Sequence, residues 1–144
     1  QFGDGWAKVS GCSTRDIILH RDLADDMIDE NCKVVSGVLN DPYTGESIQF
    51  TKTDSAKVQI DHVVALSDAW QKGAQQLTRA QRIQLANDPL ELLATWLPKN
   101  KSFRCEYVAR QIAVKQKYTL WVTQAEKDAI IQVLATCPLQ PLPV

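Results

Sequence analysis

Four cysteines constrain the fold of this chain more than any other residues. They stand at positions 12, 32, 105 and 137 of the 144 residues, two near each end, and none forms a Cys-x-x-Cys pair of the kind that binds structural zinc. Four cysteines allow three sets of disulfides, of which we favour Cys12–Cys32 with Cys105–Cys137. Two disulfides imply an oxidising compartment, whereas the alternative, four buried free thiols, implies the cytosol.

The first of these disulfides limits the length of the first helix. Ser13-Thr14-Arg15-Asp16 is typical of a helix start, with a hydroxyl cap and an acidic residue in the first turn. A helix from there to Glu30 would hold its two ends roughly 25 Å apart. A disulfide joins Cα atoms that are only about 4.4–6.8 Å apart. We therefore expect the helix to end near Leu23 and the chain to turn back through residues 25–31.

The rest of the pattern predicts an α+β fold. Strands are expected at residues 34–39, 47–50, 57–60 and 90–94, and a turn over residues 40–45 joins the first two. Helices are expected over residues 68–75, 78–86 and 102–115 and after the capping box of Thr123 and Glu126. We expect a single domain over residues 1–137 and a proline-rich tail over residues 138–144. No apolar run approaches the length of about 18 residues that a membrane span requires.

The formal net charge of −1 hides an uneven distribution of charge. Residues 1–60 carry a net charge of −4 and residues 61–144 a net charge of +3. Six basic residues lie close together, at Lys99, Lys101, Arg104, Arg110, Lys115 and Lys117. This basic segment predicts either a surface that faces phosphates or a solvated helix face.

Only some of these basic residues can contact one DNA backbone. At about 100° per residue, Arg104, Lys115 and, less closely, Lys101 share one side of a helix, whereas Arg110 and Lys117 point elsewhere. We therefore expect at most about three phosphate contacts from this segment.

Asp61 and His62 are the strongest candidates for chemistry. They follow the alternating run of residues 57–60 and precede an apolar stretch. Histidine is the usual general base in enzymes, and aspartate is a hard oxygen ligand for a divalent cation. The alternative is a buried histidine that is hydrogen-bonded to a neighbour.

The segment Asp61-His62-Val63-Val64-Ala65-Leu66-Ser67-Asp68-Ala69-Trp70 resembles the first motif of the His-Asn-His (HNH) nucleases. More specifically, the chain resembles the secreted bacterial branch of these nucleases that is related to the C-terminal nuclease domain of the GmrSD type IV restriction enzymes. Further blocks match that branch in order, at residues 11–15, 21–23, 41–45, 86–90, 96–98 and 107–112. The resemblance covers nearly the whole chain.

The resemblance implies a ββα-metal (HNH-like) nuclease core to which additional helices are attached. The core would bind one divalent cation, for which we expect Mg²⁺, with Mn²⁺ or Ca²⁺ as alternatives. His62 would activate water as the general base, and Asp61 would bind the metal. Glu91 would hold the histidine ring, at a position where the family often has asparagine. Arg15 and Arg110 would each contact a phosphate or pair with an acidic residue inside the fold.

These features predict a secreted, monomeric endonuclease, its leader removed, that hydrolyses phosphodiester bonds of DNA, or of RNA, with little sequence specificity. The alternative is a non-catalytic HNH-fold module that binds nucleic acid or protein at the cell surface. One departure from the family favours this alternative: members carry an Asn-x-x-Lys loop after the second strand, whereas here Thr95 runs directly into Trp96-Leu97-Pro98. Either the protein lacks this loop or the sequence omits it.

Overall fold

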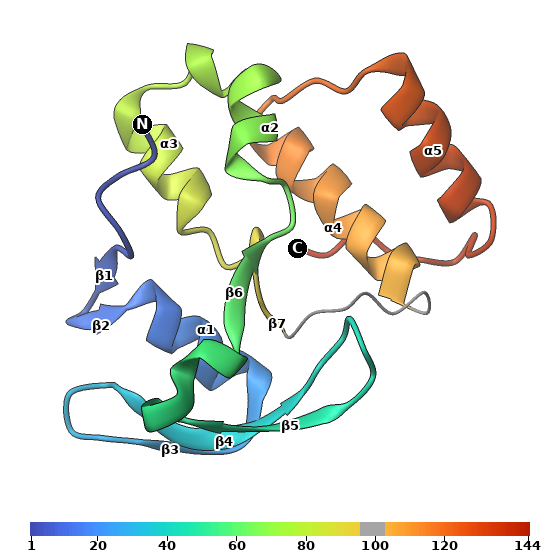
Figure 1. Ribbon diagram of the computed structural model, residues 1–144. Helices are drawn as coiled ribbons and strands as arrows, with labels where there is room; N and C mark the ends of the chain where they lie inside the picture. Colours follow the sequence, from blue (N-terminus) through green and yellow to red (C-terminus); the bar gives the residue numbers. More distant parts are fainter. Residues whose placement is uncertain (96–102) are drawn as a thin grey trace. The chain divides into compact units, whose positions relative to one another are not determined.

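The computed structural model describes residues 1–95 and 103–144 and shows a mixed α/β fold (Figure 1). The chain divides into two compact units. We call one the sheet unit, which contains residues 3–61 and the described residues 92–95. The other, the helical unit, contains residues 1–2, 62–91 and the described residues from 103 onward.

The sheet unit is built on an antiparallel sheet in the order β3 (Leu23–Ile28), β4 (Val34–Asn40) and β5 (Ser47–Thr51). Helix α1 (Thr14–Asp22) packs against β3 and β4 (Figure 1). The predicted hairpin of β4 and β5 is confirmed, and Gly37 of β4 pairs with Phe50 of β5. This arrangement places one face of the sheet against the helix.

The core of the sheet unit combines side chains from distant parts of the sequence. A short pair of strands, β1 (Lys8–Val9) and β2 (Cys12–Ser13), precedes α1. The buried cluster contains Ile18, Leu19, Leu23, Val34, Leu39, Phe50, Val58, Leu92 and Ala94. Burial of these aliphatic and aromatic side chains stabilises the unit by roughly 1.5–3 kcal/mol for each large residue.

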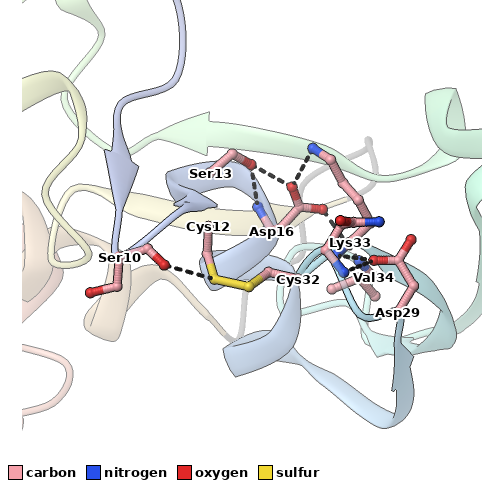
Figure 2. The surroundings of a disulfide bond; sticks show 9 residues. Ser10, Cys12, Ser13, Asp16, Asp29, Cys32, Lys33 and Val34 are labelled. Atoms are coloured by element: carbon pink, nitrogen blue, oxygen red, sulfur yellow. Dashed lines mark hydrogen bonds and ion pairs between the residues drawn. A yellow bond between two sulfur atoms is a disulfide. The ribbon is translucent and has the colours of Figure 1, made fainter.

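Figure 2 shows how the start of α1 is tied to the turn between β3 and β4. The Cys12–Cys32 disulfide joins Cys12, in the strand β2 directly before α1, to this turn, with Cα atoms 5.3 Å apart. Beside it, the buried Asp16 carboxylate accepts hydrogen bonds from the Ser13 hydroxyl and, at 2.9 Å, from Lys33 Nζ. Burial by itself would raise the pKa of Asp16, but these donors hold that pKa below its ordinary value.

The second disulfide joins Cys105, in α4 (Arg104–Lys117), to Cys137, which follows α5 (Gln124–Leu134). The two Cα atoms lie 6.4 Å apart. Both disulfides therefore confirm the predicted pairing, and the alternative of free thiols is wrong.

The first helix ends at Asp22, close to the predicted end at Leu23, but the chain turns back only in the last part of the predicted range of residues 25–31. The chain continues as β3 as far as Ile28 and turns only at Asp29, whose carboxylate accepts two backbone N–H groups of the turn at 2.9 Å. The disulfide requires only that Cys32 return to the start of the helix. A longer hairpin satisfies this requirement as well as a shorter loop does.

Strands β6 (Gln59–His62) and β7 (Leu92–Thr95) form a separate two-stranded sheet. Both begin two residues later than predicted. The 3₁₀ helix Lys52–Lys57 includes the first residue of the strand predicted at 57–60, so β6 begins later. Before β7, the chain forms a turn in which the Asp88 side chain accepts the backbone N–H of Leu90, so this strand also begins later. As a result, His62 lies within β6 instead of following it.

The backbone of β7 is held by the last two residues of α1. Arg21 Nη2 donates to the carbonyl oxygen of Leu92 at 2.7 Å, and the backbone N–H of Ala94 donates to Asp22 Oδ2 at 2.8 Å. Leu92 and Ala94 are two positions apart, so these groups lie on the same side of the strand. The paired Arg21 and Asp22 side chains therefore bind β7 as a neighbouring strand would.

The helical unit contains α2 (Leu66–Gln71), α3 (Arg79–Ala86), α4 and α5. The predicted helix over residues 68–75 is shorter than expected, because α2 ends before a 3₁₀ turn at Ala74–Gln76. The capping box of Thr123 and Glu126 at the start of α5 is confirmed. No helix in the described part of the chain is long and apolar enough to cross a membrane.

Four charged side chains connect three helices of this unit. Lys72, at the end of α2, contacts Asp68 at 2.5 Å and also Glu126 of α5. Lys115 of α4 contacts Asp68 at 3.0 Å and Glu126 at 3.5 Å. We call Asp68, Lys72, Lys115 and Glu126 the ion network.

Candidate active site

Asp61 lies in β6 and is held by a tyrosine from a distant turn. The Tyr43 hydroxyl donates a hydrogen bond to Asp61 Oδ2 at 2.5 Å. Tyr43 is buried, with 4% of its surface exposed, whereas Asp61 is half-buried. Within the described residues, Asp61 Oδ1 makes no hydrogen bond or ion pair.

The turn that carries Tyr43 is itself anchored. Asp41, which is 1% exposed, accepts hydrogen bonds from the Thr44 backbone N–H at 2.8 Å and from the Thr44 hydroxyl at 2.7 Å. Its other oxygen accepts a hydrogen bond from the Thr95 hydroxyl at 3.0 Å. Because Thr95 belongs to β7, the partner strand of β6, the turn is connected to the same sheet as Asp61.

His62 forms a hydrogen bond with the end of α3. The ring nitrogen Nε2 lies 3.0 Å from the carbonyl oxygen of Ala86. A carbonyl oxygen only accepts hydrogen bonds, so we assign the ring proton to Nε2. In the neutral ring, Nδ1 then carries the lone pair that can accept a proton.

Glu91 holds the backbone that follows His62. Its carboxylate is fully buried and accepts the backbone N–H of Val64 at 3.2 and 3.3 Å. The Glu91 carbonyl oxygen accepts the backbone N–H of Val63 at 2.9 Å, and Gln111 Nε2 donates to the Val63 carbonyl oxygen at 2.7 Å. These bonds fix the backbone directly after His62. Direct contact of Glu91 with the His62 ring stays a prediction.

Arg15 makes its hydrogen bonds within the sheet unit. It donates to the carbonyl oxygens of Val58 at 3.1 Å and Ser55 at 3.4 Å. Burial lowers the pKa of Arg15, and the neighbouring Asp16 opposes this effect. The arginine thus supports the segment that leads into β6, and a phosphate contact stays a prediction.

Arg110 is mostly buried, with 15% of its side chain exposed. Nη1 donates to the Leu90 carbonyl oxygen at 3.2 Å, and Nη2 lies 3.8 Å from Glu106 Oε1. Of the two predicted roles, the contacts favour the internal one, in which Arg110 holds the segment before β7. Its role in phosphate binding also stays a prediction.

The predicted basic face of α4 is wrong for Lys115. This side chain is 8% exposed and belongs to the ion network, so it does not share a solvated face with the exposed Arg104. Lys117 contacts Asp88 at 2.6 Å. The carboxylates that contact Lys115 lie 11 and 47 positions away in the sequence, and Asp88 also lies outside α4. Lys99 and Lys101 lie outside the described residues.

The described residues offer few protein ligands for a divalent cation. Among residues 1–95 and 103–144, no group of three or more histidine, cysteine, aspartate or glutamate side chains is arranged to hold a metal ion. Asp61 nevertheless offers one carboxylate oxygen. Mg²⁺ commonly keeps several waters and is bound through one or two carboxylates together with substrate phosphates. One carboxylate oxygen is compatible with Mg²⁺ bound in this way, whereas the described residues form no all-protein metal cage.

Sequence reasoning missed Tyr43, Asp41 and Gln111. Tyr43 and Asp41 were expected only as turn residues, and Gln111 only as part of a matched helix block. The signal for all three was their position in the blocks of the resemblance at residues 41–45 and 107–112.

One comparison with known proteins agrees with the resemblance, and a second finds a secreted relative. The family model described as GmrSD restriction endonucleases, C-terminal domain, matches residues 14–133. A protein of Arthroderma benhamiae named "Uncharacterized secreted protein" is 38% identical over 150 residues, covering 92% of this chain and 72% of the relative. The alignment is longer than the part of this chain that it covers, so the relative contains residues without a counterpart here. No solved structure matches the chain.

Proposed function

The chain belongs to the family of GmrSD restriction endonuclease C-terminal domains, and we propose that it is an endonuclease that hydrolyses phosphodiester bonds of DNA. RNA is a second substrate class, because its backbone contains the same kind of bond. The observation that carries the proposal is the placement of His62, whose Nε2 faces the Ala86 carbonyl oxygen and whose Nδ1 can accept a proton.

His62 is the general base of the proposed reaction. Nδ1 takes a proton from a water molecule, and the water oxygen forms a bond to phosphorus. The bond from phosphorus to the 3′ oxygen breaks, its electron pair stays on that oxygen, and the oxygen takes a proton from solvent. The bonds to Val63 and Val64 keep the base in place, and small displacements of a base reduce the rate strongly.

Asp61 is the residue that would hold the divalent cation. When bound, the ion supplies positive charge that stabilises the phosphate and the leaving oxygen as negative charge develops. Mg²⁺ is the first choice, and Mn²⁺ or Ca²⁺ are alternatives with the same preference for oxygen ligands.

We further propose that β6, β7 and α4 correspond to the ββα-metal unit of the HNH nucleases. They follow one another along the chain in the order strand, strand and helix, with α2 and α3 inserted between the two strands. Little sequence specificity is expected, because contacts to phosphates position a protein on DNA without reading its bases.

Secretion and action as a monomer are also part of the proposal. The Arthroderma benhamiae relative is named a secreted protein. The two disulfides suit an oxidising compartment.

The second candidate function is a non-catalytic module that binds nucleic acid or protein. The direct connection of Thr95 to Trp96, without the Asn-x-x-Lys loop of the family, favours this candidate.

Incubation of the protein with supercoiled plasmid and Mg²⁺, with and without EDTA, separates the two candidates. Nicked and linear products that disappear with EDTA support the endonuclease. A plasmid that is retarded in a gel but remains intact favours the module. Parallel incubation with single-stranded RNA decides between the two substrate classes.

A further inference from the structure

We propose that Tyr43 is a positioning residue that orients the Asp61 carboxylate, so that Oδ1 is presented to a divalent cation. This inference rests on the proposed function and deepens it. The two residues are 18 positions apart and meet through the hydrogen bond from the Tyr43 hydroxyl to Asp61 Oδ2.

The hydrogen bond gives the two carboxylate oxygens of Asp61 different roles. Oδ2 is engaged by Tyr43, whereas Oδ1 has no polar contact in the described part of the chain. A carboxylate held by one oxygen loses rotational freedom about its terminal bond, and its other oxygen is then fixed in direction. Groups that hydrogen-bond to metal ligands in this way commonly determine both ligand orientation and metal affinity.

The position of Tyr43 is itself well determined. The ring is buried, and the turn around it is closed by the hydrogen bonds that Asp41 accepts from Thr44 and Thr95. Because Thr95 lies in β7 and Asp61 in β6, the hydroxyl and its acceptor are both anchored to the same two-stranded sheet.

A second tyrosine in this chain shows what a structural tyrosine–aspartate pair looks like. Tyr118 is buried and donates to Asp88 Oδ2 at 2.7 Å. Lys117 also contacts Asp88 Oδ2, and the Leu90 backbone N–H occupies Oδ1, so both oxygens of Asp88 are engaged. Asp88 is buried, whereas Asp61 is half-buried with one oxygen available. The contrast assigns a ligand-orienting role to Tyr43 and a structural role to Tyr118.

The test is the binding of Mn²⁺ by the full chain, measured by electron paramagnetic resonance in the presence of a phosphorothioate DNA duplex that resists cleavage. Tyr43→Phe removes only the hydroxyl and should raise the dissociation constant of Mn²⁺ by about 10–100-fold. Tyr118→Phe, the matched control, should leave it unchanged although it lowers the melting temperature. Asp61→Asn should abolish this binding, and adding Tyr43→Phe to Asp61→Asn should have no further effect.

The possible failures are distinguishable. Mn²⁺ binding by Tyr43→Phe that equals that of the unaltered protein, while Asp61→Asn has lost it, overturns the role of Tyr43 and leaves the proposed function intact. Absence of Mn²⁺ binding by the unaltered protein also overturns the inference. Plasmid cleavage by the same preparation then decides separately whether the protein is a nuclease.

A measurement on the unaltered protein covers the case in which Tyr43→Phe does not fold. With tyrosine labelled by ¹³C at the ring carbon that bears the hydroxyl, titration with Mg²⁺ in the presence of the same phosphorothioate duplex should move the resonance of Tyr43 and leave that of Tyr118 in place. A Tyr43 resonance that does not respond to saturating Mg²⁺ contradicts the inference.

Discussion

The side chain of Glu91 accepts the backbone N–H of Val64, 27 positions earlier in the chain and two residues after His62. Both residues are fully or almost fully buried, so the bond is shielded from water. The candidate base therefore depends on Glu91 through the main chain, in addition to any direct contact with its ring.

Replacement of Glu91 should affect both stability and cleavage. Glu91→Ala leaves the buried Val64 N–H without its acceptor, which costs about 1–3 kcal/mol of unfolding free energy. Cleavage should fall by about tenfold or more, because an orienting partner of a catalytic group is lost. Urea denaturation and plasmid cleavage measure the two effects. Glu91→Gln keeps an oxygen acceptor and should lose less of both, and a Glu91→Ala variant as stable as the unaltered protein would contradict the assignment.

His62→Ala should reduce cleavage by about 10²-fold or more, the usual scale for loss of a general base, without unfolding the protein. The chain offers a matched control in its other histidine. His20 is 61% exposed and pairs with Asp26, so His20→Ala should cleave at nearly the normal rate. Initial rates of plasmid nicking and circular dichroism spectra test both variants. Near-normal cleavage by His62→Ala would contradict the proposed mechanism.

Arg110 and Arg104 should differ in what their loss changes. Arg110→Ala removes hydrogen bonds of a mostly buried charged group, worth about 1.5–3 kcal/mol, and should lower the melting temperature without changing the salt dependence of DNA binding. Arg104 is exposed, and Arg104→Ala should leave the melting temperature nearly unchanged. If Arg104 contacts a phosphate, its loss reduces the slope of log affinity against log salt by about 0.9. A reduced slope for Arg110→Ala with an unchanged melting temperature would instead assign the phosphate contact to Arg110.

Local features of the fold could be predicted because their causes lie within a few residues. The cap at Ser13 and the capping box of Thr123 and Glu126 each depend on a side chain and a backbone group three positions away. The disulfide Cys12–Cys32 could be used to place the end of the first helix, because its length requirement is strict. The first residues of strands β6 and β7 were predicted less accurately, because the residues before them form a short 3₁₀ helix and a turn instead of strand.

The partners within the candidate site could not be predicted, because they come from distant parts of the chain. The Tyr43–Asp61 and Glu91–Val64 bonds connect residues 18 and 27 positions apart, and no periodicity in the sequence encodes such pairs. Lys115 shows the same limit. Its neighbours in the sequence indicate an exposed basic helix face, but its charge is neutralised by Asp68, 47 positions earlier.

The ion network should make the helical unit sensitive to acid through Glu126. Burial alone would raise the pKa of this carboxyl, but hydrogen bonds from Lys72 and Thr123 and the charge of Lys115 lower it from 4.5 to about 2. The folded protein therefore binds the proton on Glu126 less tightly than the unfolded chain does. The stabilisation is fully present above about pH 4.5, declines as the pH falls from there towards about 2, and is absent below.

Glu126→Gln should remove this stabilisation and its pH dependence together. The variant should unfold at a lower urea concentration than the unaltered protein above about pH 4.5, and the difference should shrink as the pH approaches about 2, where Glu126 is protonated in both states. Asp128→Asn is the matched control, because Asp128 lies on the same helix but is exposed and makes no ion pair within the described residues. Urea denaturation midpoints measured across this range decide the question. A Glu126→Gln difference that stays constant from neutral pH down to about 2 would show that the network stabilises the unit through packing and not through charge.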